Sequence, residues 1–176
     1  ADILLALRGR DKRAQLVTFQ QKLLQLKFFD PACGCGNFLI ITYRELRALE
    51  MQVIAALRSL RNADGQDELD APDLSIINVD QFYGIELEEF SVRVAETAMW
   101  MMDHIMNNHL SLQYGQGYAR IPLISSPTVI HGDALELDWQ DVPPSGECNY
   151  ILGNPPFSGA KTQSLVQRRQ VCDVAR

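Results

Sequence analysis

The sequence lacks any stretch of about 18 or more consecutive apolar residues, the length that a membrane-spanning helix requires. It also has few cysteines: Cys33, Cys35, Cys148 and Cys172 are the four in 176 residues. Their spacing provides neither a disulfide framework nor paired CxxC zinc ligands. We therefore expect a reducing, cytoplasmic setting.

An excess of basic residues is absent as well. The formal net charge is −6, whereas a chain that neutralises nucleic-acid phosphates usually carries more Lys and Arg than Asp and Glu. If DNA is a substrate, we expect other parts of the full-length protein to grip it. With 47% hydrophobic residues, the chain is long enough for one folded domain.

The apolar pattern alternates between helical and strand-like segments. Helical spacing is found over residues 1–26, from Phe38 to Leu60, and from about Leu87 to Asn108. Short apolar runs predict strands in "LKFFD", "QFYGIE", "TVIHGDAL" and "CNYILGN". This alternation predicts a parallel α/β sheet whose strand ends meet at one edge, where such sheets bind ligands.

Two helical segments carry apolar stripes. We expect two sets to face the core: Leu39, Tyr43, Leu46, Leu49, Val53, Leu57 and Leu60 in the first segment, and Phe90, Val94, Ala98, Met101 and Ile105 in the second. The polar segments Asn62–Asp73 and Ser111–Pro122 predict loops. His131 and Asp133 have no further ligand candidate nearby, so we expect no metal site.

Each predicted strand ends in residues that suit a ligand. After the first strand, Gly34 and Gly36 permit positive φ angles and close approach of the backbone to a ligand. Tight packing of the next helix would explain these glycines equally well. The turn is not a GxGxxG dinucleotide fingerprint, because Leu39 stands at the third glycine position.

A carboxylate also occurs at or just after the end of each of the first three predicted strands. Glu86 is placed to accept hydrogen bonds from ribose hydroxyls, and Asp133 to accept one from an amino group. With Asp30 they bring three acids to one edge, which suits a ligand with hydroxyls, an amine and positive character. Each acid alone is also a common helix cap.

Four motifs occur in a fixed order: "DPACGCGNFL", "GIEL", "HGDAL" and "GNPPF". This order resembles the S-adenosylmethionine-dependent adenine-N6 DNA methyltransferases, in particular the type IIG-like modification modules of bacterial restriction–modification enzymes. The resemblance covers nearly all of residues 26–159. It implies a class I methyltransferase fold, a Rossmann-like open parallel sheet with flanking helices, truncated after the fourth strand. Residues 1–25 would then be an N-terminal helical segment, 26–159 would carry the motifs, and 160–176 would be a tail.

The resemblance also implies a role for each motif. The turn after the first strand would hold the methionine part of S-adenosylmethionine, Glu86 the ribose, and Asp133 with Ala134 the adenine. The implied cofactor-binding residues are Asp30, Pro31, Ala32, Cys33, Gly34, Gly36, Asn37, Phe38, Glu86, Leu87, Asp133 and Ala134. The implied catalytic residues are Asn154, Pro155, Pro156 and Phe157.

The chemistry of adenine methylation explains the catalytic motif. The N6 amine is a poor nucleophile because its lone pair is delocalised into the ring. The Asn154 side-chain oxygen and the Pro155 carbonyl would accept its two hydrogens, and the prolines would fix this acceptor geometry. Phe157 would stack on a base swung out of the duplex.

Other interpretations remain open from the sequence. The same tetrad serves enzymes that methylate a glutamine amide in release factors or a guanine amino group in ribosomal RNA. It could also be a turn in a non-catalytic scaffold. We expect DNA to be bound through parts of the full-length protein outside these residues. We further expect the isolated fragment to bind cofactor weakly, to lack turnover and to self-associate through its uncovered edge strand.

Overall fold

The computed structural model describes residues 11–64, 75–114, 125–143 and 147–154. Its helices and strands follow one another along the chain as α2 (Lys12–Gln25), β1 (Phe28–Asp30), α3 (Asn37–Asp64), η2 (Val79–Gln81), β2 (Phe82–Glu86), α4 (Glu89–Tyr114), β3 (Thr128–His131), η3 (Trp139–Asp141) and β4 (Tyr150–Ile151). Among these residues, no helix is long and apolar enough to cross a membrane.

The four strands form one parallel sheet in the order β3-β2-β1-β4. Asp30 at the end of β1 pairs with Gly84, and Glu86 at the end of β2 pairs with His131. Because all pairs are parallel, every strand ends at the same edge of the sheet. The expected α/β fold with an open parallel sheet and flanking helices is confirmed.

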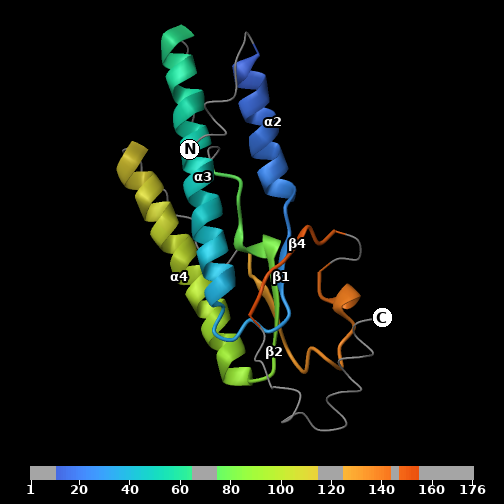
Figure 1. Ribbon diagram of the computed structural model, residues 1–176. Coiled ribbons are helices and arrows are strands. Elements are labelled where there is room, and N and C mark those ends of the chain that lie inside the picture. Colours follow the sequence, from blue (N-terminus) through green and yellow to red (C-terminus); the bar gives the residue numbers. More distant parts are fainter. Residues whose placement is uncertain (1–10, 65–74, 115–124, 144–146, 155–176) are drawn as a thin grey trace.

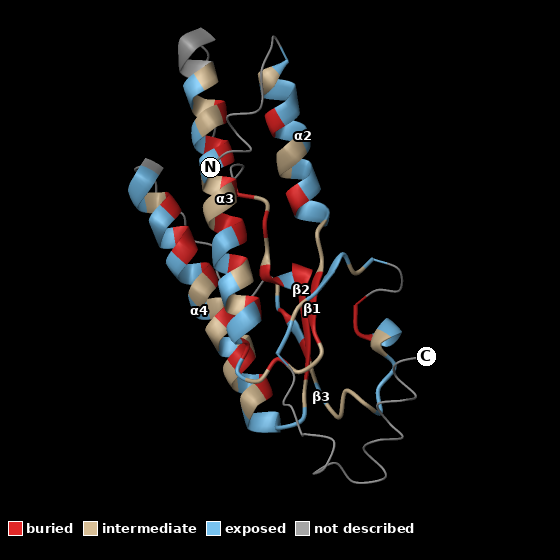
Figure 2. Cartoon of the chain, in the orientation of Figure 1, coloured by how far each residue is buried: buried red, intermediate tan, exposed pale blue. Residues whose placement is uncertain are grey.

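The main core lies between the sheet and its helices. Helices α3 and α4 lie beside the sheet in Figure 1, while α2 lies above the strands and next to α3, and Figure 2 shows buried residues of these helices turned inward. Phe28 and Phe82 stack with ring centroids 5.0 Å apart, and Tyr43 of α3 meets Phe82 edge-on. The stripe predicted for α3 is confirmed, since its seven residues are buried or half-buried.

A smaller core covers the opposite face. There Phe29, Tyr83 and Ile85 pack with Val142 and the half-buried Trp139. The Trp139 ring meets Phe29 edge-on at 5.6 Å between centroids. Described residues between β3 and β4, Trp139 and Val142 among them, therefore cover part of the face of the sheet opposite the main core.

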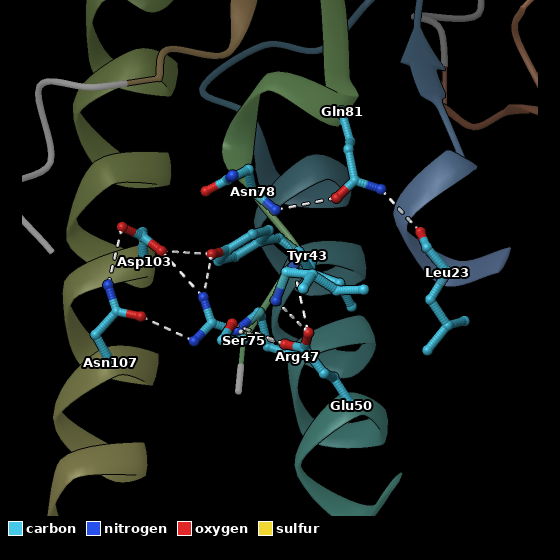
Figure 3. Close-up of polar contacts among 11 residues, drawn as sticks. Leu23, Tyr43, Arg47, Glu50, Ser75, Asn78, Gln81, Asp103 and Asn107 are labelled. Carbon is cyan, nitrogen blue, oxygen red and sulfur yellow. Dashed lines mark hydrogen bonds and ion pairs between the residues drawn. The ribbon is translucent and has the colours of Figure 1, made fainter. Parts of the chain in front are cut away.

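A buried polar network joins α3 to α4 (Figure 3). Arg47 is fully buried, and its guanidinium donates hydrogen bonds to Asp103, to Asn107 and to the Tyr43 hydroxyl. Burial alone would lower the pKa of Arg47, but its neighbours, Tyr43 and Glu50 first among them, outweigh that effect and raise it. The network is charged, and it fixes how the two helices meet.

Glu50 extends the network to the strand layer. Its carboxylate accepts hydrogen bonds from the backbone of Ile76 and Ile77 and from the Ser75 hydroxyl. It also lies 3.4 Å from the Arg47 Nε atom. Nearby, Gln81 donates to the carbonyls of Leu23 and Leu26, which links the entry to β2 with the end of α2. These contacts hold β2 in place relative to the helices.

The stripe predicted for α4 is wrong at three of its five residues, whereas Val94 and Ala98 are half-buried. Phe90 is 79% exposed, Met101 61% and Ile105 42%. The buried face lies elsewhere on the helix and consists of Val92, Ala95, Met99, Met106 and Leu110, with the buried Asp103 and Asn107. The helix has apolar residues on more than one face, and the position of α3 decides which of them is buried.

Some predicted boundaries also differ. Helix α4 continues through Ser111–Tyr114, and α3 through residues 62–64, where loops were predicted. The third strand ends at His131, and Asp133 lies in the turn that follows. The remaining residues of both predicted loops lie outside the described residues.

Candidate cofactor and catalytic site

The glycine turn follows β1 and precedes α3. Gly34 has a φ of +57° and Gly36 a φ of +82°, so both adopt the left-handed conformation that glycine favours. A Cβ on Gly36 would lie 3.0 Å from the Ala95 side chain of α4, whereas one on Gly34 would meet no atom within 4 Å. Packing against α4 therefore explains why residue 36 is a glycine. Packing does not explain Gly34, beside whose backbone there is open space.

Glu86 connects the end of β2 to this turn. One of its carboxylate oxygens accepts a hydrogen bond from the Gly34 N–H at 2.9 Å, and the other accepts one from the Glu88 N–H at 3.0 Å. Each oxygen keeps lone-pair capacity for a further donor. Glu86 is half-buried, so part of the residue is accessible to solvent.

Asp30 is fully buried at the end of β1. Its Oδ1 atom accepts a hydrogen bond from the Ala32 N–H at 3.0 Å, while Oδ2 is buried without a hydrogen-bond partner in the described part of the chain. Burial raises the pKa of the Asp30 carboxyl, and the charge of Glu86 raises it further, against the opposing effect of the Ala32 hydrogen bond.

Cys33 fills the space beneath the turn. It is buried, and a Cβ on Gly84 would lie only 2.9 Å from its sulfur. Burial raises the pKa of its thiol to about 12. Cys33 therefore acts as a small neutral side chain that brings the turn close to β2.

Asp133 and Ala134 lie in the turn after β3. The Asp133 carboxylate accepts a hydrogen bond from the Leu135 N–H at 2.9 Å, so it caps this turn. The Ala134 carbonyl accepts one from the Trp139 indole at 2.7 Å. Both residues are half-buried beside the end of β2, where the Gly132 N–H donates to the Glu86 carbonyl.

Exposed apolar side chains occur near the starts of the helices that follow β1 and β2. Phe38 near the start of α3 is 46% exposed, and Leu87, directly after Glu86, is 60% exposed. Phe90 near the start of α4 is more exposed still. Large exposed apolar groups at the sheet edge that carries Glu86 suit a ligand that combines an aromatic ring with a sugar.

Asn154 follows β4 on the same edge. Gly153, the preceding residue, has a φ of +152°, and a Cβ on it would lie 2.8 Å from the Asp30 Oδ1 atom. Asn154 itself is exposed. Gly153, directly before Asn154, thus lies beside Asp30 and Pro31 at the end of β1, while Pro155, Pro156 and Phe157 lie outside the described residues.

Other predicted residues fall at this edge too. Pro31 and Ala32 are half-buried in the turn, and Asn37 is exposed at the start of α3. Sequence reasoning assigned no role to Gly153, and it placed Phe90 in the core-facing stripe of α4, whereas Phe90 is exposed. The glycine directly before Asn154 was the available signal for the first. In the described part of the chain, no three His, Cys, Asp or Glu side chains gather as metal ligands.

A family model matches residues 7–176, and its description is the DNA-methyltransferase domain of MmeI. The chain belongs to this family. It is 36% identical over 167 residues to DNA methyltransferase A of Bacillus subtilis (strain 168), an alignment that covers 93% of this chain and 18% of that protein.

A solved structure is similar as well. The Type IIL restriction-modification enzyme MmeI, determined in complex with DNA, matches with a TM-score of 0.83 and 48% identity. The match covers 93% of this chain and 21% of that chain. The chain therefore spans about a fifth of the length of these relatives. The resemblance to restriction–modification methyltransferases is confirmed.

Proposed function

We propose that this chain is the cofactor-binding part of a restriction–modification DNA methyltransferase. The full-length protein would transfer a methyl group from S-adenosylmethionine to the N6 amino group of adenine in DNA. The observation that carries this proposal is that Glu86 binds the Gly34 N–H while Gly153, directly before Asn154, lies beside Asp30 at the same sheet edge, in a member of the MmeI family.

The residues at this edge fit S-adenosylmethionine. The open space above Gly34 admits the methionine part close to the backbone, and the Glu86 carboxylate can accept hydrogen bonds from ribose hydroxyls. The exposed side chain of Leu87 offers a surface for the adenine ring, with Asp133 and Ala134 close by. When bound, the cofactor supplies an electrophilic methyl group.

Asn154 would act on the amine that receives the methyl group. Its side-chain oxygen, with the Pro155 carbonyl, would accept the two N6 hydrogens and orient the nitrogen lone pair. Pro156 would stiffen this acceptor, and Phe157 would stack on the extruded base. No covalent nucleophile is needed, because acceptors held in place act where charge develops in the transition state.

Family membership supports DNA over ribosomal RNA or protein as the substrate class. We propose that DNA is held mainly by parts of the full-length protein outside this chain, because these residues carry a net charge of −6. The division into a helical segment, a motif region and a tail, and the cytoplasmic setting, belong to the same proposal.

Calorimetric titration of the full-length protein with S-adenosylmethionine tests the cofactor site. Gly34→Asp places a carboxylate in the open space beside Glu86, so we expect cofactor affinity to fall by about tenfold or more. Cys35→Asp is the matched control, because it adds the same charge one residue later at an exposed position. Equal affinities of the two variants would contradict the assignment of Gly34.

Product analysis tests the reaction. After incubation of duplex DNA with the full-length protein and labelled cofactor, digestion to nucleosides should yield N6-methyladenine. Asn154→Ala should lower turnover on the order of 100-fold while cofactor affinity stays unchanged. Label recovered in cytosine, in RNA or in protein would overturn adenine as the acceptor.

A further inference from the structure

Asp30 and Gly153 meet where two parallel strands end. The Leu152 N–H donates to the Phe29 carbonyl at 2.7 Å, which continues the pairing of β4 with β1 beyond Ile151. The next residue, Gly153, then lies against the Asp30 side chain. A Cβ at this position would stand 2.8 Å from Asp30 Oδ1 and 3.4 Å from its Cγ. A contact of 2.8 Å is closer than real Cβ atoms come to a neighbour.

The conformation of Gly153 requires glycine for a second reason. Its φ of +152° lies in a region that residues with a Cβ rarely adopt. The backbone immediately before Asn154 therefore has both a special conformation and a close neighbour. Asp30 supplies that neighbour.

Asp30 is also in contact with the glycine turn. Its Oδ1 atom accepts a hydrogen bond from the Ala32 N–H at 3.0 Å. The N–H of Gly34, two residues after Ala32, donates to Glu86. One carboxyl group thus touches the turn assigned to the methyl donor and the loop assigned to the methyl acceptor.

The burial of Asp30 argues against direct contact with a ligand. None of its surface is exposed, so a bound cofactor would reach it only after the surrounding chain had moved.

From these contacts we propose that Asp30 is a positioning residue: it fixes the Gly153–Asn154 backbone against the glycine turn and so sets the acceptor relative to the methyl donor. This inference rests on the proposed function of the site. Displacing a reacting group by about 1 Å can cost on the order of 100-fold in rate. Loosening the contact should therefore lower turnover more than cofactor affinity.

Three variants of the full-length protein test the proposal. Asp30→Asn keeps the size of the side chain and the acceptor for Ala32, but loses the capacity for charge. Asp30→Ala removes the contact, and Gly153→Ala adds the crowding Cβ. Cofactor affinity is measured by calorimetry, and turnover by methyl transfer to duplex DNA at saturating cofactor.

We expect Asp30→Asn to stay within about threefold of wild type in both measurements. Asp30→Ala and Gly153→Ala should lose about tenfold or more in turnover, with cofactor affinity within about threefold. Retained affinity shows at the same time that the site is folded. The double variant Asp30→Ala/Gly153→Ala should lose less than the product of the two single losses, since the residues are in contact.

Two results would overturn the inference while leaving the proposed function intact. One is a loss of cofactor affinity of about tenfold or more in Asp30→Asn, which would mean that the Asp30 carboxylate binds the cofactor directly. The other is unchanged turnover in Gly153→Ala. Absence of cofactor binding or DNA methylation by the wild-type protein would instead overturn the proposed function, and the inference with it.

Discussion

Replacing Arg47 with methionine should loosen the packing of α3 against α4. The guanidinium is fully buried and contacts two acids, Glu50 and Asp103. Methionine has a similar length, so the change removes the charge and the donors while filling most of the space. Both carboxylates then stay in the interior without their cation.

The structure indicates how large the effect should be. Glu50 keeps its hydrogen bonds from Ile76, Ile77 and Ser75, and Asp103 keeps that from the Tyr43 hydroxyl at 2.5 Å. These bonds offset part of the loss, but removing one partner of a buried pair costs about 3–5 kcal/mol. That free energy corresponds to roughly two to four orders of magnitude in an opening equilibrium.

Hydrogen exchange of the full-length protein, followed by mass spectrometry, measures this opening locally. Peptides from the middle of α3 and α4 should exchange faster in Arg47→Met by the factor above. Arg44→Met is the matched control, because Arg44 lies on the same helix in an exposed ion pair with Glu45. In Arg44→Met, exchange of the same peptides should change less than about tenfold relative to wild type.

A second variant separates lost charge from lost packing. In Arg47→Met/Asp103→Asn one of the uncompensated carboxylates is neutral, so protection should partly return. If the single variant exchanges like wild type, or the double variant exchanges faster than the single one, the charge argument is refuted.

Three further predictions follow from burial and exposure. Because burial raises the pKa of Asp30, the wild-type protein should lose stability as pH rises from the ordinary carboxyl pKa of about 3.9 up to the raised value. The melting temperature of Asp30→Asn relative to wild type should therefore rise through this pH window. A difference in melting temperature that does not depend on pH would contradict the shift. Iodoacetamide should modify the exposed Cys35 in the native protein and reach Cys33, whose thiol has a pKa of about 12, only after unfolding, as peptide mapping would reveal; equal labelling of both would count against the buried turn. The 176-residue chain expressed by itself should self-associate through β4, where Ile151 is 62% exposed, and Ile151→Lys should reduce this in light scattering; a wild-type chain that is monomeric at every concentration would exclude an edge-strand contact.

Much of the candidate site could be predicted from the sequence because it depends on chain order. Short apolar runs separated by helical segments predict parallel strands, and parallel strands must end at a common edge. The residues that follow each run are therefore neighbours whatever the details of packing. Gly34 and Glu86 were predicted together on this ground, and a hydrogen bond joins them.

Helical periodicity could not identify the buried face of α4. Phe90 and Met101 form as regular an apolar stripe as Val92 and Met99 do, and hydrophobicity alone treats the two alike. Which face of α4 is buried depends on which face meets α3. Ala95 marks that face, because a Cβ on Gly36, just before α3, would lie 3.0 Å from its side chain. The third strand was predicted too long for a similar reason, since the turn at Asp133 depends on a hydrogen bond to Leu135.

By itself, then, the sequence determined the order of the elements, the parallel sheet and the gathering of its motifs at one edge, because connectivity and local pattern suffice for these. Only the tertiary structure decided that Arg47 would be buried among acids, that Gly36 serves packing while Gly34 faces open space, and that Asp30 lies against Gly153. These features arise from contacts between segments far apart in the chain, where the position of one element determines whether a side chain on another is covered, paired or free to meet a ligand.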